Sequence, residues 1–218
     1  MKEYHKIETI YARDTEGTKK LMEGIYCNET VEFLSKCQWE WTEKVDGINV
    51  RIRWDGHKVE FGGRTDKAQI PAPLVNKLNE YFGGEENAQL FEQTFGDREV
   101  IIFGEGYGAK IQSGRDYTDG QSVDFIMFDL LIGENYQPRE SMLKCAKIFG
   151  VKAVPVVGWG TLEEAVDFVK SHPISTLGNK KHEMEGIVCR PLVELNDRCH
   201  NRVIVKIKWK DFKHLAGE

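Results

Sequence analysis

The sequence predicts an α+β domain with largely antiparallel sheets and flanking helices. Strand patterns outnumber helix patterns along the 218 residues. Most strand patterns also follow one another too closely for the helical crossover that parallel neighbours need. The dipeptide Asp55-Gly56, between two alternating segments, indicates a tight hairpin turn. No internal repeat or linker is evident, so residues 1–218 are expected to form a single domain.

The predicted strands are short segments in which apolar side chains alternate with polar ones or follow one another without a break. Residues 48–54 show the alternation clearly, because Asn49, Arg51 and Arg53 fall between apolar positions. Residues 98–103 are rich in Val and Ile, which is typical of a buried strand. The other predicted strands are residues 38–43, 57–63, 122–132, 151–157, 184–190 and 202–209.

The predicted helices begin at capping residues or show apolar residues at helical spacing. Asn28 is placed to cap a helix at residues 28–36, and Thr161 to Glu164 has the spacing of a capping box. Residues 71–82 start with proline and are followed by two glycines, as helices often are. The remaining predicted helices are residues 85–95 and 140–149, and residues 171–181 are predicted to be a loop.

The composition is that of an ordinary globular protein. The chain is 40% hydrophobic and 30% charged, and it has no apolar run long enough to span a bilayer. Its first residues lack the apolar core of a signal peptide, which predicts a cytoplasmic protein with no membrane partner. The net charge of -5 means that nucleic acid would have to bind through local patches. The five cysteines show no metal-ligand spacing and are expected to be reduced thiols.

Charged residues interrupt apolar segments at several positions, and burying a charge is costly unless it is paired or used. They are Lys44, Arg64, Glu105, Asp129, Glu185, Lys206 and Lys208. Lys44 stands at a turn, where it could be a surface charge or a nucleophile. Lys206 and Lys208 share one strand face about 7 Å apart, a spacing that suits successive phosphates of a nucleoside triphosphate. The alternative for these two lysines is the solvated face of an edge strand.

Glu105 and Glu185 each stand beside glycine at a predicted strand end. Glycine permits the backbone to approach a ligand closely or to turn unusually. Two carboxylates brought together could hold the sugar hydroxyls of a nucleotide and a hard divalent cation. The alternative for each is an exposed acid in a turn.

Six motifs follow one another in order along residues 44–208. They are Lys44-Val45-Asp46-Gly47, Arg64, Phe103-Gly104-Glu105-Gly106, Phe125-Ile126-Met127-Phe128-Asp129, Glu185-Gly186-Ile187-Val188 and Lys206-Ile207-Lys208. This pattern resembles the covalent nucleotidyltransferase superfamily, which comprises polynucleotide ligases and messenger-RNA capping enzymes. The resemblance implies the antiparallel-rich, two-sheet fold of ligase adenylation domains.

Two details look like the RNA ligases that seal nicked or paired RNA. Asn49 stands where DNA ligases and capping enzymes usually have arginine, and Phe103-Gly104-Glu105 replaces the Asp-Gly-Glu of DNA ligases. The resemblance therefore implies an ATP-dependent RNA ligase that uses Mg²⁺ or Mn²⁺ and joins RNA ends carrying a 5′-phosphate and a 3′-hydroxyl. The alternatives are a DNA ligase or capping-type guanylyltransferase, and a nucleotide-binding scaffold without catalysis.

The resemblance also assigns roles to individual residues. Lys44 would attack the α-phosphate of ATP and become joined to AMP, and it must be neutral to do so. Lys206, Lys208 and the metal would disfavour its charge and neutralise the triphosphate. The remaining implied contacts are Glu43 with the adenine edge, Phe128 or alternatively Phe125 on the base, Asn49, Arg64 and Glu105 around the ribose and α-phosphate, and Glu185 with Glu105 at the metal.

Only ten residues, 209–218, follow the last motif, whereas ligases of this class carry a further domain there. We therefore expect a stand-alone adenylylating core without a C-terminal OB or helical domain. RNA would then be bound by a partner protein or by surface charges. The candidate surface residues are Arg51, Arg53, Lys110 and Arg115.

Overall fold

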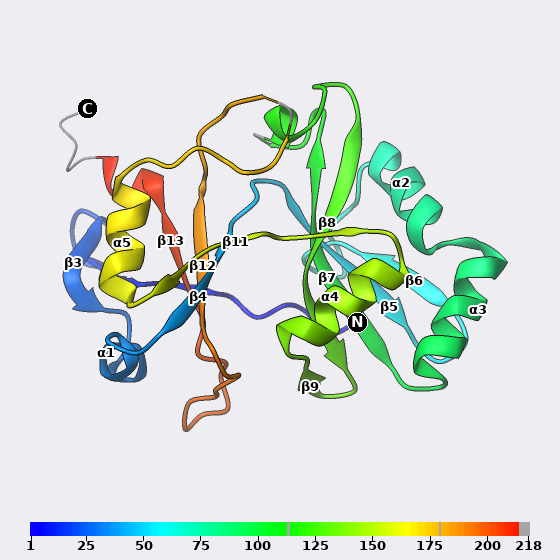
Figure 1. The fold of residues 1–218 in the computed structure, drawn as a ribbon, viewed down its shortest axis with the longest axis horizontal. Coiled ribbons are helices and arrows are strands. Elements are labelled where there is room, and N and C mark those ends of the chain that lie inside the picture. The colour runs from blue at the N-terminus through cyan, green and yellow to red at the C-terminus, as the bar shows by residue number, and fades with distance from the viewer. Residues whose placement is uncertain (113, 179, 214–218) are drawn as a thin grey trace. The chain divides into compact units, whose positions relative to one another are not determined.

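The computed structural model describes residues 1–112, 114–178 and 180–213, with the backbone alone of Arg115. The chain forms two compact units (Figure 1). Unit 1 consists of Met1–His5, Asp46–Val154, Gly178 and Lys180, and unit 2 consists of Lys6–Val45, Pro155–Leu177 and the described residues from Lys181 onward. Both units are sheets with helices, so the predicted α+β class is confirmed.

The sheet of unit 1 has the strand order β10-β8-β7-β5-β6, and β9 pairs with β8. Its strands are β5 (Ile48–Trp54), β6 (Val59–Gly62), β7 (Val100–Gly108), β8 (Val123–Ile132), β9 (Asn135–Tyr136) and β10 (Lys152–Ala153). All pairs are antiparallel except β10 with β8. The predicted hairpin turn between β5 and β6 is confirmed: Asp55 accepts hydrogen bonds from the amides of His57 and Lys58, and Gly56 takes the left-handed conformation that suits glycine.

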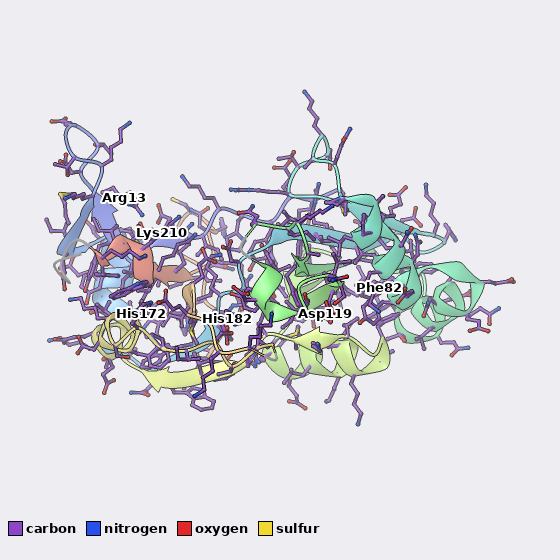
Figure 2. All side chains as sticks on the ribbon, turned by 90° about the horizontal axis from the view of Figure 1, so that it is seen from above. Arg13, Phe82, Asp119, His172, His182 and Lys210 are labelled. Carbon is purple, nitrogen blue, oxygen red and sulfur yellow. The ribbon has the colours of Figure 1, made fainter. Side chains whose placement is uncertain are left out.

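Helices cover one face of this sheet. They are α2 (Ala72–Phe82), α3 (Gly84–Phe95) and α4 (Arg139–Ile148), and a 3-10 turn, η1, spans Gly114–Tyr117. The apolar positions of α2 fit its helical spacing, since Leu74, Leu78 and Phe82 are all buried. Phe82, labelled in Figure 2, packs in the same apolar core as Val50 and Ile52 of β5. The other face of β5 carries Asn49, Arg51 and Arg53.

Unit 2 is built on a second sheet with the strand order β1-β13-β12-β4-β11. Its strands are β1 (Glu8–Thr9), β4 (Trp39–Glu43), β11 (Val156–Gly160), β12 (Gly186–Pro191) and β13 (Val205–Lys208), and β2 (Tyr11–Arg13) forms a separate pair with β3 (Leu21–Tyr26). The pairs in the larger sheet are antiparallel except β1 with β13. The strands before residue 27 were not predicted.

The helices of unit 2 are α1 (Glu29–Leu34) and α5 (Leu162–Lys170), and a 3-10 turn, η2, spans Trp209–Asp211. Both predicted caps are confirmed. Asn28 accepts a hydrogen bond from the amide of Val31 at 2.9 Å, and Thr161 and Glu164 form the capping box. The buried side of α5 packs in a core that also contains Trp39 and Trp41 of β4.

One strand differs from the sequence prediction in a way that affects the site. Glu105 was expected at a strand end, but it lies inside β7, which continues to Gly108. The neighbouring glycines, which suggested a turn, instead allow close packing: a Cβ on Gly104 would lie 2.2 Å from the Phe125 ring, and one on Gly106 would lie 2.2 Å from Leu74. Glu105 is therefore held in a continuous strand.

Candidate active site

Lys44, Glu185 and Lys208 form an ion cluster in unit 2. Nζ of Lys44 donates to Oε2 of Glu185 at 2.6 Å, and Nζ of Lys208 donates to Oε1 of the same carboxylate at 2.6 Å. The three side chains are 23%, 15% and 17% exposed, respectively. One largely buried carboxylate thus bridges two ammonium groups through charge-assisted hydrogen bonds, which are stronger than hydrogen bonds between neutral groups.

The strand pairing explains why residues so far apart in sequence meet here. The amide of Lys44 donates to the carbonyl of Gly186 at 2.9 Å, just after β4 ends, and Gly186 is the register partner of Lys208 on β13. Gly186 therefore lies between the two lysine-bearing segments. A Cβ at this position would lie 2.0 Å from the carbonyl oxygen of Ile207, so only glycine fits the approach.

Lys206 lies on the same strand as Lys208, two residues earlier. The predicted alternation is confirmed, because Val205 and Ile207 are buried while both lysines are only partly covered. In register, Lys206 is the partner of Val188, which in turn is the partner of Thr42 on β4. Lys206 and Lys208 consequently share one face of the sheet of unit 2.

The ion cluster keeps Glu185 ionised. Burial by itself raises the pKa of this carboxyl, but the charge of Lys44 and the hydrogen bond from Lys208 outweigh it and hold the pKa below its ordinary value. The carboxylate therefore carries a negative charge at neutral pH and partly offsets the two positive charges beside it.

Glu43 is buried and is held by two hydroxyl residues that sequence reasoning missed. Its carboxylate accepts hydrogen bonds from Oγ of Ser175, from the amide of Thr176 at 3.0 Å and from Oγ1 of Thr176 at 2.7 Å. The two residues stand in the segment predicted only as a loop, where no spacing marks them as partners of a strand residue. Three of the roughly four acceptor positions of the carboxylate are thus used.

In unit 1, Asn49 and Glu105 are register partners on β5 and β7, so the structure brings these two predicted site residues together on one sheet. Oδ1 of Asn49 is buried and has no hydrogen-bond partner among the residues that the structure describes. A buried acceptor without a hydrogen bond costs free energy, so a ligand hydroxyl that donates to this atom would relieve that cost.

The two candidate stacking residues lie on opposite faces of β8. Phe125 is fully buried beneath the helices and meets Phe82 edge to face, with ring centroids 5.6 Å apart. Phe128 is only partly buried and packs with Phe103 and with Tyr4, whose ring centroid is 5.0 Å away. Val50 and Ile52 of β5 point into the helix-covered core, so Asn49, which alternates with them, points to the opposite face of the sheet. Asn49, its register partner Glu105 and Phe128 therefore share that face.

The arginines and lysine expected to bind RNA at the surface fare differently. The prediction that Arg51 lies at the surface is wrong: the residue is 0% exposed, and its guanidinium donates hydrogen bonds to protein acceptors. Arg53 is paired with Glu60 and Glu99, and Lys110 is exposed. The side chain of Arg115 lies outside the described residues.

Arg64, predicted to act around the ribose and α-phosphate, is exposed.

The carboxylates expected at a metal belong to different units, Glu185 to unit 2 and Glu105 to unit 1. Within the described ranges, no three His, Cys, Asp or Glu side chains cluster so that they could hold a metal ion. Likewise, no helix in those ranges is both long and apolar enough to cross a membrane.

The motifs and their geometry agree with a comparison to known families. The RNA ligase family model matches residues 37–208, which include the whole ion cluster. The chain belongs to the RNA ligase family. No curated protein matches this RNA ligase family member.

Solved structures show the same fold. A Naegleria gruberi RNA ligase variant with ATP and manganese aligns with a TM-score of 0.63 at 19% identity, covering 85% of this chain and 54% of that one. The Naegleria gruberi enzyme with pyrophosphate aligns with a TM-score of 0.62 at 20% identity, covering 87% and 55%. A variant with AMP and manganese gives 0.64 at 18% identity, covering 87% and 54%. This chain therefore spans about half the length of those ligases, and the predicted ligase fold is confirmed.

Proposed function

We propose that this chain is an ATP-dependent RNA ligase core that joins a 3′-hydroxyl and a 5′-phosphate through a covalent lysyl-AMP. The observation that carries the proposal is the cluster of Lys44, Glu185 and Lys208, which lies inside the segment matched by the RNA ligase family. A lysine in such a cluster has charged neighbours that can orient it and offset the charge of an incoming triphosphate.

Lys44 is the nucleophile in this proposal. Its Nζ forms a bond to the α-phosphorus of ATP while the bond from that phosphorus to the pyrophosphate oxygen breaks. The amine must first lose a proton, and in this structure its Nζ is engaged in a hydrogen bond to Glu185. We expect Glu185 to release Lys44 when ATP binds, so that Lys206 and Lys208 then disfavour the ammonium form and meet the departing phosphates.

The residues present fit a Mg²⁺ or Mn²⁺ ion bound together with ATP. These cations prefer oxygen ligands, and Mg²⁺ is commonly held by one or two carboxylates plus substrate phosphates, without an all-protein cage. Glu185 would supply an ionised carboxylate for this purpose. When bound, the ion neutralises negative charge on the triphosphate.

Residues in each of the two sheets are suited to contacts with a nucleoside. Asn49, with its unpartnered Oδ1, suits a ribose hydroxyl, and Glu105 and Arg64 are assigned to the ribose and α-phosphate. Phe128 is proposed as the stacking residue because Phe125 is enclosed in the core. Glu43 would use its remaining acceptor position for the adenine amino group.

In the later steps, AMP passes to an RNA 5′-phosphate and is displaced by the 3′-hydroxyl. A partner protein that supplies RNA binding, a role in RNA repair and a cytoplasmic location stay predictions. The proposal is tested by a sealing assay on single-stranded RNA, nicked duplex RNA and RNA/DNA hybrids that follows the AMP-capped intermediate and the joined product. Sealing of nicked DNA alone, or use of GTP in place of ATP, would contradict it.

A further inference from the structure

Arg51 is a buried arginine whose contacts surround the loop that carries Arg64. It is 0% exposed. Its Nε donates to the carbonyl of Gly63 at 2.6 Å, and its Nη2 donates to Asp66 Oδ1 at 2.9 Å. Arg64 lies between these two acceptors in the sequence. The buried guanidinium therefore holds the loop on both sides of the exposed arginine.

Further contacts hold the guanidinium of Arg51 in place. Nη1 of Arg51 also donates to the carbonyls of Met1 at 2.7 Å and Lys2 at 3.2 Å, so the guanidinium is fixed from a third direction. Gly62 is the register partner of Arg51, and a Cβ there would lie only 3.3 Å from Nη2. The hydrogen bond from Arg51 also lowers the pKa of Asp66, which keeps its carboxylate ionised.

Arg64 contrasts with Arg51. Its side chain is exposed and makes no hydrogen bond or ion pair with another described residue. A guanidinium presents a rigid fork of donors that matches phosphate, and holding it in place beforehand reduces the entropy lost on binding. A free arginine on a loop that is pinned on both sides is therefore suited to bind a phosphate group.

We propose that Arg51 is a positioning residue that fixes Arg64 to bind a phosphate group of the substrates, either that of ATP or the RNA 5′-phosphate. The inference rests on the proposed ligase function and deepens it. It replaces the prediction that Arg51 itself contacts RNA, because the guanidinium of Arg51 donates its hydrogen bonds to protein acceptors.

The test uses Asp66→Ala, because Asp66 is 66% exposed and its loss leaves the buried Arg51 with its backbone acceptors. Arg51→Lys is the second variant, since lysine keeps the charge but lacks the fork. Glu60→Ala is the matched control: it removes a carboxylate of β6 that pairs with Arg53 of β5 and makes no contact with the guanidinium of Arg51. Each variant is also combined with Arg64→Ala.

Two single-turnover rates are measured in the full chain: formation of lysyl-AMP from ATP, and transfer of AMP from the protein to 5′-phosphorylated RNA. We expect Asp66→Ala and Arg51→Lys to slow one of these steps about tenfold or more, since small misplacements of a binding group are costly. Neither change should add to the defect of Arg64→Ala, because both act through that residue. The Glu60→Ala variant should keep both rates. The step that slows identifies the source of the phosphate.

Additive defects in the double variants, or unchanged rates in Asp66→Ala and Arg51→Lys, would overturn the positioning role. Unchanged rates in Arg64→Ala, with lysyl-AMP still formed, would overturn it as well while leaving the ligase proposal intact. If the unsubstituted chain forms no lysyl-AMP at all, the ligase proposal itself fails, and the two failures are thereby distinguished.

Discussion

Replacing Glu185 by glutamine should destabilise the protein at neutral pH and have little effect in acid. The carboxylate lies 2.6 Å from both Lys44 and Lys208. Opposite unit charges about 4 Å apart attract by about 4 kcal/mol at an effective dielectric constant near 20. Desolvation offsets part of this, and removing one partner of a buried pair costs about 3–5 kcal/mol. We expect a loss of about 3 kcal/mol in the free energy of unfolding at pH 7, at the lower end of that range because the three side chains keep 15–23% of their surface exposed.

The dependence on pH follows from the lowered pKa of Glu185 in the folded protein. Its stabilising contribution is fully present above the unfolded pKa of about 4.3 and is lost as the pH falls through the lower folded value. Urea unfolding of the parent and of Glu185→Gln should therefore differ at pH 7 and converge in acid. Glu140→Gln, which removes an exposed pair with Lys144, is the control and should leave the urea midpoint unchanged. Equal destabilisation at both pH values would refute the reasoning.

Two further predictions concern the residues around the base. Combining Ser175→Ala with Thr176→Val should lower the free energy of unfolding by about 1–3 kcal/mol, because the buried carboxylate of Glu43 loses two hydrogen-bond donors. Chemical denaturation measures this change, and an unchanged midpoint would contradict the prediction. Phe125→Ala should lower the free energy of unfolding by about 3–5 kcal/mol, as expected for a buried aromatic residue. Phe128→Ala should mainly weaken ATP binding, measured by calorimetry. The reverse pattern would make Phe125 the residue that stacks on the base.

The sequence predicted most elements because their signals are local. The caps at Asn28 and Thr161 and the turn at Asp55-Gly56 depend on side chains that act within a few residues, and all three are confirmed. The glycines beside Glu105 misled the prediction of a strand end, because their reason is the packing of Phe125 and Leu74 from distant segments. Such packing leaves no local trace in the sequence.

The site shows the same division. The alternation of Lys206 and Lys208 with buried residues followed from the strand pattern and is confirmed. The burial of Arg51 could not be foreseen, because the acceptors that enclose it come from two separate segments, the N-terminal residues and the loop after β6. The hydroxyls that hold Glu43 were missed for the same reason, since Ser175 lies 132 residues away in the chain.

The most direct test of the central claim is to locate a covalent AMP on the protein. The full chain is incubated with α-labelled ATP and Mg²⁺ and denatured at neutral to alkaline pH, where a phosphoramidate is stable, and the adduct is mapped by mass spectrometry of its peptides. We predict one AMP bonded to Lys44, with one pyrophosphate released for each AMP attached. No adduct should form in Lys44→Ala, and a normal adduct should form in Lys36→Ala, whose lysine is exposed in the same unit. An adduct that persists in Lys44→Ala, or the absence of any adduct despite ATP binding, would contradict the account.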